Sequence, residues 1–165
     1  MPATYEAISS TTLGSAASSI TFSSIPGTYT DLRIVCVGKS NANGQWYVRF
    51  NGLSTSLYSY TNISGSGSAA ASAAATNDNA MYFNYSDTYS TTQPAMITMD
   101  IFSYAGSTNK TSLLTYNGDR NGSGIVERTV GLWRSTAAIT SVGIFDNSGS
   151  FTTGFTATLY GILKA

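Results

Sequence analysis

The sequence predicts an all-β protein, an antiparallel β-sandwich that is jelly-roll-like and has about ten strands. Three observations predict it. The composition suits a half-buried pleated surface, with 23 threonines, 11 tyrosines and 7 phenylalanines among 165 residues. Short runs with apolar residues at alternate positions recur along the chain, and turn residues separate almost all of them. No ten-residue stretch has the apolar spacing of an amphipathic helix.

The expected strands follow one another at short spacing. They are residues 19–23, 31–38, 45–50, 57–61, 80–85, 95–104, 110–116, 125–134, 139–145 and 155–163. Residues 31–38 are apolar at nearly every position after Arg33, so we expect a central strand that is covered on both faces over part of its length. Within residues 45–50, alternation predicts that Trp46, Val48 and Phe50 face the core.

The segments between and before these strands set the organisation of the chain. Residues 1–17 are expected to be a strand or an extended arm, and residues 18–165 a single sandwich domain. Residues 64–76 are of low complexity and predict a long loop, either a contact surface or a solvated loop tip. Residues 117–124 are typical of a turn. No repeat of fixed period is present, which argues against a propeller or a β-helix.

Residues 129–145 contain two consecutive expected strands and a small polar connector. Alternation places Gly131 and Trp133 on one face and Val130, Leu132 and Arg134 on the other. Trp133 is therefore interpreted as a packing residue over a glycine, and not as a ligand-stacking residue. By the same rule, Glu127 and Arg128 point to opposite faces.

The charge balance excludes some classes of partner. Lysine and arginine number 8, aspartate and glutamate number 8, and charged residues make up only 10% of the chain. A formal net charge of zero gives no basic field for nucleic acid and little repulsion between copies, so self-association is expected. No signal peptide or membrane span is expected. The single cysteine, Cys36, lies in an apolar run and predicts a plain core residue.

The sequence offers little for catalysis. The chain has no histidine, so Ser-His-Asp and Cys-His arrangements are impossible and histidine metal sites are excluded. The only carboxylate pair worth testing as a glycosidase is Asp100 with Glu127, and the preferred interpretation is that they pair with Arg33, Arg49 or Arg128 on a sheet face. We expect no enzyme activity, no catalytic residues, no cofactor and no metal site.

The tyrosines suggest one possible binding surface. Tyr58, Tyr60, Tyr82 and Tyr85 could stack on sugar rings if they line an exposed groove. The alternative is that they form core and cross-strand contacts, as aromatic residues in sandwiches usually do.

Two stretches resemble a known family. One is residues 12–32, where a strand, a Pro-Gly turn and a second strand follow in order; the other is residues 129–145 with the core Gly-Leu-Trp-Arg, joined to Leu-Tyr-Gly-Ile at 159–162. These stretches are similar to small β-rich virion proteins of tailed bacteriophages, including cyanophages, which occur as head decoration (cement) proteins and as parts of tail fibres. Residues 39–119 are largely unmatched.

The resemblance implies a structural protein of the virion. The first expectation is a capsid decoration protein, made in the host cytoplasm and placed on the outer capsid surface, where it binds the major capsid protein and stabilises the head lattice, with self-association as a homotrimer. The alternative is a tail-fibre or receptor-binding domain that recognises a host surface glycan. Neither implies nucleic-acid or membrane partners.

Overall fold

The computed structural model describes residues 4–84, 91–120 and 122–163, without the side chain of Arg120. These residues form twelve strands and no helix. The strands are β1 (Tyr5–Thr12), β2 (Ser19–Phe22), β3 (Asp31–Gly38), β4 (Trp46–Phe50), β5 (Tyr58–Gly65), β6 (Ala70–Asp78), β7 (Met81–Tyr82), β8 (Ala95–Ile101), β9 (Lys110–Arg120), β10 (Ser123–Trp133), β11 (Val142–Asp146) and β12 (Thr156–Ile162). The predicted all-β class is confirmed, with two more strands than expected.

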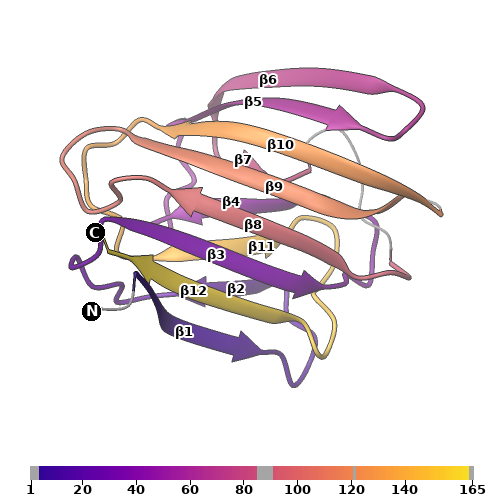
Figure 1. The fold of residues 1–165 in the computed structure, drawn as a ribbon, viewed down its shortest axis with the longest axis horizontal. Helices are drawn as coiled ribbons and strands as arrows, with labels where there is room; N and C mark the ends of the chain where they lie inside the picture. Colours follow the sequence, from indigo (N-terminus) through magenta and orange to yellow (C-terminus); the bar gives the residue numbers. More distant parts are fainter. Residues whose placement is uncertain (1–3, 85–90, 121, 164–165) are drawn as a thin grey trace.

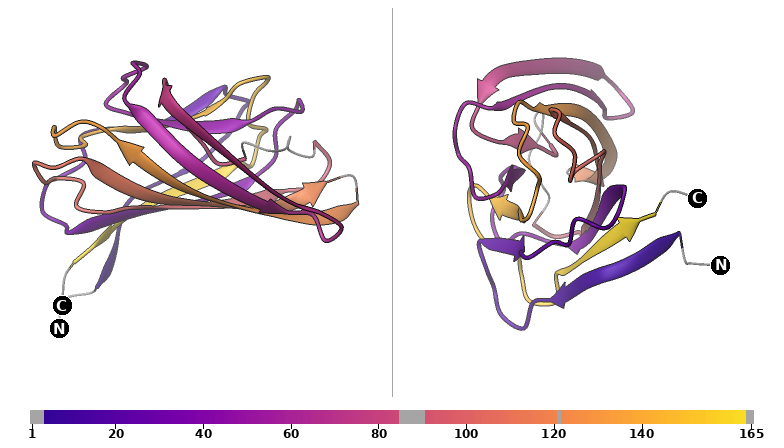
Figure 2. Two further views of the ribbon diagram at one scale, coloured as in Figure 1. Left: turned by 90° about the horizontal axis from the view of Figure 1, so that it is seen from above. Right: turned by 90° about the vertical axis from the view of Figure 1, so that its left-hand side faces the viewer.

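The strands form two antiparallel sheets packed as a sandwich (Figures 1 and 2). The larger sheet has eight strands in the order β1-β12-β3-β8-β9-β10-β5-β6, and the smaller has four in the order β2-β11-β4-β7. In the view of Figure 1 the larger sheet lies in front of the smaller one. One face of the larger sheet therefore covers the smaller sheet, and we call the opposite face, which points to solvent, the outer face.

The core lies between the two sheets and follows the predicted alternation. Trp46, Val48 and Phe50 on β4 are fully buried, as predicted. Trp46 packs edge-to-face on Phe151 and Phe155, with ring centroids 5.2 and 5.3 Å apart. Aromatic packing of this kind supplies much of the buried apolar area in a chain with few leucines.

Residues 129–145 place their two strands in different sheets, because β10 belongs to the larger sheet and β11 to the smaller. Gly131 and Trp133 are buried and Val130 is exposed, so the predicted faces are confirmed. A Cβ on Gly131 would lie only 2.1 Å from Sδ of Met81, so the glycine makes room for Met81. The second strand begins only at Val142, later than predicted.

Several predictions about strands and loops are wrong. Residues 64–76 are not a long loop, because residues 70–76 belong to β6 and pair with β5. The strand predicted at residues 80–85 is limited to β7 among the residues described. The predicted turn at 117–124 is narrower, since β9 runs to Arg120 and β10 starts at Ser123. At residues 64–76 and 117–124, cross-strand pairing overrides the local preference of small and polar residues for loops.

The strand β3 is central, between β12 and β8, but it is not covered on both faces. Leu32, Ile34 and Cys36 are buried, whereas Val37 on the other face is 42% exposed. In the part of the chain that the structure describes, no sheet packs on that face, because the smaller sheet covers the other side. Burial raises the pKa of Cys36, and the thiol is a core group as predicted.

Residues 1–17 were expected to form a strand or an extended arm. The described part contains β1, which pairs with β12 and forms one edge of the larger sheet. Asn51 and Gly52 form a turn after β4, with φ values of 53° and 67°.

Candidate functional site

The outer face of the larger sheet collects most of the exposed apolar side chains. Eight large hydrophobic residues are exposed among those described, and six of them lie on this face: Tyr5, Val37, Ile63, Met96, Val126 and Val130. Ile63, Val126 and Val130 are exposed by 59%, 57% and 54% of their surface. Exposed apolar side chains gathered on one face mark an interaction surface more often than isolated ones do.

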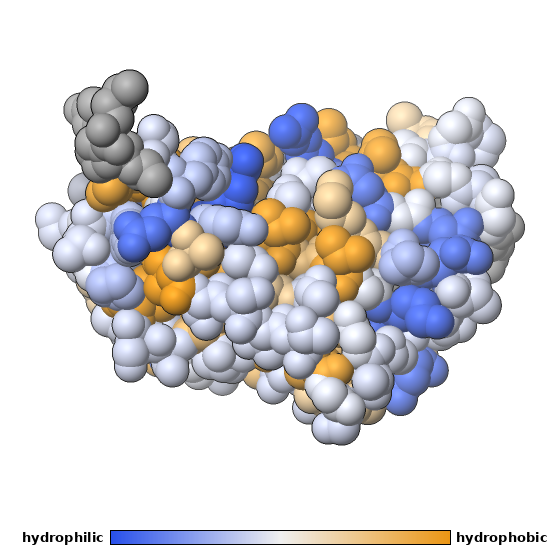
Figure 3. Space-filling view, turned by 60° about the horizontal axis from the view of Figure 1, so that its bottom comes forward, coloured by the Kyte–Doolittle hydropathy of each residue, from blue (hydrophilic) through white to orange (hydrophobic). Residues whose placement is uncertain are grey.

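The strand register places three of these residues close together. Val130 lies opposite Thr61, Arg128 opposite Ile63, and Val126 opposite Gly65. Ile63 therefore sits between the levels of Val126 and Val130 on the neighbouring strand, within reach of diagonal contacts. Hydroxyl side chains fill much of the rest of the face. Figure 3, in which the β1 edge is turned forward, shows apolar groups separated by surface of intermediate hydropathy and by some hydrophilic groups.

Charge on the outer face is sparse and largely compensated. Arg33 donates from Nε and Nη2 to the two carboxylate oxygens of Asp100, at 2.6 and 2.7 Å. These hydrogen bonds to Asp100 raise the pKa of Arg33 further. The guanidinium also lies 5.8 Å from the ring centroid of Tyr5. The preferred interpretation, in which Asp100 and Glu127 pair with arginines on a sheet face, is confirmed for Asp100, whose charge Arg33 neutralises.

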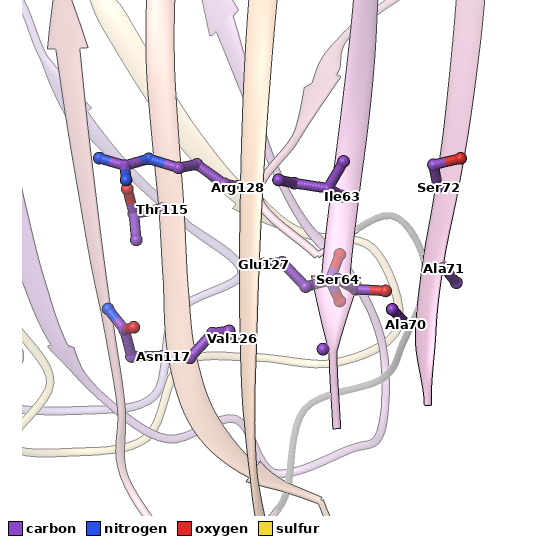
Figure 4. A pocket seen from close by; sticks show the side chains of 11 residues that line it. Ile63, Ser64, Ala70, Ala71, Ser72, Thr115, Asn117, Val126, Glu127 and Arg128 are labelled. Carbon is purple, nitrogen blue, oxygen red and sulfur yellow. The ribbon is translucent and has the colours of Figure 1, made fainter. Parts of the chain in front are cut away.

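A groove of about 770 Å³ opens on the outer face where β9, β10, β5 and β6 run side by side. Thr115, Arg128, Ile63 and Ser72 lie in one row across these four strands (Figure 4). Asn117, Val126, Gly65 and Ala70 form the next row. The small side chains of β6 leave the groove open on that side.

Arg128 is the charged side chain of this groove that points to the outer face. Its side chain extends across β9 toward Thr115 (Figure 4). No described residue forms an ion pair or hydrogen bond with its guanidinium, in contrast to Arg33. Apolar walls with a few polar groups are typical of ligand sites. The groove can therefore offer a cation, an amide from Asn117 and a hydroxyl from Thr115 to a ligand.

Glu127 lies on the opposite face from Arg128, as predicted, and is buried with 1% of its surface exposed. Its Oε2 accepts a hydrogen bond from Nδ2 of Asn62 at 2.9 Å. Asp100 points to the outer face and Glu127 to the interior, so the two carboxylates do not flank a common cleft. The glycosidase pair considered from the sequence is therefore wrong.

The possible sugar-stacking surface is wrong for Tyr58 and Tyr60, and the alternative, that they form core contacts, is confirmed. Tyr58 is fully buried and Tyr60 is 4% exposed, because β5 turns both side chains toward the smaller sheet. The Tyr58 hydroxyl donates to the carbonyl of Leu53 at 3.0 Å, and burial raises its pKa. Tyr82 is half-buried, with its ring centroid 6.0 Å from that of Tyr60. Tyr85 lies outside the described residues.

The sequence contains a signal that could have identified the outer-face residues. If Tyr58 and Tyr60 face the core, alternation along β5 sends Ile63 to the other side. The same alternation along β10 places Val126 and Val130 on the exposed face when Trp133 lies on the buried one. The sequence does not reveal that β5 and β10 are neighbours. Without this, Ile63 on β5 cannot be placed beside Val126 and Val130 on β10.

The described residues lack two kinds of functional feature. They hold no group of three or more histidine, cysteine, aspartate or glutamate side chains placed to bind a metal ion. They also contain no helix of the length and apolarity needed to span a membrane.

The comparisons with known proteins give distant likenesses of fold. No protein-family model and no curated protein matches the chain. Among solved structures, it is similar to the galectin LEC-6 of Caenorhabditis elegans, with 10% identity and a TM-score of 0.40 over 91% of this chain and 94% of that one. It is also similar to a tetrameric galectin of the ball sponge Cinachyrella sp., with 13% identity and a TM-score of 0.35 over 88% and 99%. A sucrose-6-phosphate hydrolase of Lactobacillus gasseri has 14% identity and a TM-score of 0.28, over 89% of this chain and 28% of that one.

Proposed function

We propose that this protein is a structural component of a bacteriophage virion, a decoration protein that binds the outside of the head through the outer face of its larger sheet. The observation that carries the proposal is the group of exposed apolar side chains on that face, of which Ile63, Val126 and Val130 lie close together on β5 and β10. The resemblance of residues 12–32 and 129–145 to phage virion proteins supplies the biological setting.

The physical basis is burial of apolar surface between two proteins. The outer face has apolar side chains among hydroxyl-bearing ones and few free charges. Covering it with another protein costs little desolvation energy, because few charged groups lose their hydration. Each exposed apolar side chain that becomes buried contributes roughly 25 cal/mol per Å². A regular lattice presents the same acceptor surface many times, so even a modest affinity per copy stabilises contacts between capsid subunits.

The proposal is tested by placing charge on the outer face. We expect Val126→Lys with Val130→Lys to reduce the copies bound to virions at least roughly tenfold, because a buried unpaired lysine is costly. Leu53→Lys is the matched control, since Leu53 is 37% exposed but lies outside the sheet. Mass spectrometry of purified virions counts the copies. The proposal would be contradicted if the double variant bound virions at the full copy number. It would also be contradicted if virions carried only a handful of copies of the parent protein, and not hundreds.

The groove favours a second candidate function, a tail-fibre or receptor-binding domain that recognises a host surface glycan. Arg128, Asn117 and Thr115 offer hydrogen bonds to sugar hydroxyl or carboxylate groups beside the apolar Ile63 and Val126. Under this proposal, Arg128→Ala weakens binding on a glycan array and slows adsorption of phage to host cells. Thr98→Ala, on the same face but outside the groove, is the control. An empty array with normal adsorption would reject it.

Both proposals assign this chain a binding function, and neither assigns it a bond-making or bond-breaking step. The copy-number and adsorption experiments separate them. A decoration protein loses virion occupancy when charge is placed at Val126 and Val130, and adsorption of phage to host cells falls only as far as that loss of occupancy causes it to. A receptor-binding domain keeps its occupancy and loses adsorption when the groove is altered.

A further inference from the structure

β6 extends the larger sheet beyond the part that the smaller sheet covers, whereas its hairpin partner β5 still buries Tyr58 and Tyr60 against that sheet. The tight turn is closed by a hydrogen bond from the Ser66 amide to the Ala69 carbonyl, at 3.0 Å. No residue of β6 is buried, although its side chains point alternately to the two faces. Ala70, Ala71 and Ser72 are all exposed. β6 is therefore held mainly by its backbone pairing with β5, and an edge strand exposed in this way is a ready template for pairing with another chain.

The free edge of β6 presents a definite set of backbone groups. β6 is the last strand of the larger sheet and pairs only with β5. Hydrogen-bonded and non-hydrogen-bonded pairs alternate along an antiparallel ladder. Because the Ser66–Ala69 pair is hydrogen-bonded, Ala71 and Ala73 also bond to β5, and the N–H and C=O groups of Ala70, Ser72 and Ala74 point away from the sheet.

This edge lacks the devices that normally prevent strand pairing, which are charges, prolines and bulges. Residues 70–76 contain no charged residue and no proline. The irregularity in β6 comes after them, where the register with β5 shifts and Asn77 has a φ of 57°. The opposite edge differs, because β1 carries Glu6 and a register shift between Ala7 and Ser9. Of the two edges of the larger sheet, as far as the structure describes them, the β6 edge alone is left unprotected along six consecutive paired residues, 70–75.

We propose that β6 pairs antiparallel with β6 of a second copy of this chain, about a twofold axis at Ser72. With Ser72 opposite itself, Ala70 of each copy lies opposite Ala74 of the other. All three outward-pointing residues then bond, giving roughly six hydrogen bonds between the copies. The paired segments are uncharged, so no like charges meet. This register joins the two larger sheets into one continuous sheet.

A second copy fits this edge because the segment is complementary to itself. A twofold strand pair is isologous and closes after two copies, so the product is a dimer. It is therefore not the homotrimer expected from the resemblance. The pairing uses the edge and leaves the outer face accessible, and it is independent of the proposed virion function.

Cysteine cross-linking tests the register. The native Cys36 is fully buried, so an introduced cysteine reports alone. Cα atoms of a directly opposed pair lie about 5.5 Å apart, within the range of a disulfide. We expect Ser72→Cys to give a disulfide-linked dimer under mild oxidation. Ser10→Cys on β1 is the matched control and should remain monomeric on a non-reducing gel. Equal cross-linking at both edges would overturn the proposal.

A proline substitution tests the edge in the unmodified assembly. The Ser72 amide points away from β5, so Ser72→Pro removes the intermolecular donor while the hairpin keeps its own ladder. Two hydrogen bonds are lost per dimer, and we expect at least roughly a tenfold weaker dimerisation by sedimentation equilibrium. Circular dichroism and the thermal midpoint confirm that the variant folds.

A third variant separates edge pairing from contact through the outer face. Val130→Lys places a charge on that face and should leave the dimer unchanged. Loss of the dimer in Val130→Lys but not in Ser72→Pro would overturn the proposal. So would a parent chain that is trimeric, or one that remains monomeric at the highest concentration reached.

Discussion

Lys110 is a fully buried cation at the start of β9, opposite Trp133 on β10. Its Nζ donates to the carbonyl of Thr108. Burial lowers the pKa of Lys110 from its ordinary value of 10.5, because the charged form loses hydration. The unfolded chain then binds more protons than the folded one at pH values between the lowered pKa and 10.5. The contribution of Lys110 to folding stability consequently rises with pH through that interval.

We therefore expect Lys110→Met to be more stable than the parent at pH 7, and to lose this advantage as the pH approaches 10.5. Urea unfolding of both proteins at several pH values measures the difference. Buried tyrosines such as Tyr58 have a raised pKa and therefore lower the folding stability above pH 10. Their contribution is the same in both proteins, so it cancels in the difference. Lys39→Met, at a half-buried loop position, is the control. A pH-independent difference would mean that the Lys110 ammonium is solvated.

Asn51 hydrogen-bonds two connections that run between the sheets, the one after β4 and the one before β11, to each other at one end of the sandwich. Its Oδ1 accepts hydrogen bonds from the amides of Thr140 and Ser141 at 2.8 and 3.1 Å, and its Nδ2 donates to the carbonyl of Ala138 at 2.8 Å. Asn51 also has a φ of 53°, which asparagine tolerates better than most residues. One side chain thus joins the segment after β4 to the segment before β11.

Two substitutions separate these contributions at Asn51. Asn51→Gly keeps the backbone freedom and loses the side-chain bonds, which we expect to cost about 2 kcal/mol of unfolding free energy. Asn51→Ala loses the same bonds and adds roughly 1 kcal/mol of strain at positive φ. Chemical denaturation of the three proteins gives both values. Equal stability of the two variants would show that the turn relaxes to negative φ.

The elements differ in how far the sequence could predict them. Trp46, Val48 and Phe50 alternate with polar residues, so their strand and its buried face follow from local pattern. β6 was missed because alanine and serine carry no apolar alternation, and its strand depends on pairing with β5. Alternation places Tyr58 and Tyr60 on one face of their strand. Whether the smaller sheet covers that face depends on the tertiary structure, which local pattern does not contain. The groove required knowing that β10 is the neighbour of β5.

At the scale of the whole molecule, the two sheets share one core. Phe50 of the smaller sheet lies edge-to-face against Trp133 of the larger sheet, with ring centroids 5.4 Å apart. Trp46 belongs to the smaller sheet and packs on Phe151 and Phe155. Each sheet therefore holds one of the two tryptophans of the chain, and both indoles are fully buried. Neither sheet can bury its apolar face without the other.

The shared core predicts a single cooperative unfolding transition, which the two tryptophans can report separately. Trp46→Phe leaves Trp133 as the fluorescence probe of the larger sheet, and Trp133→Phe leaves Trp46 as that of the smaller. Each change costs about 1–3 kcal/mol by leaving space in the core. Within each variant, we expect the midpoints by fluorescence and by far-UV circular dichroism to coincide. Because both probes are read on the same variant, the cost of the substitution cancels. A fluorescence midpoint that departs from the dichroism midpoint in either protein would mean that one sheet unfolds before the other, and the sandwich would then be two weakly coupled layers.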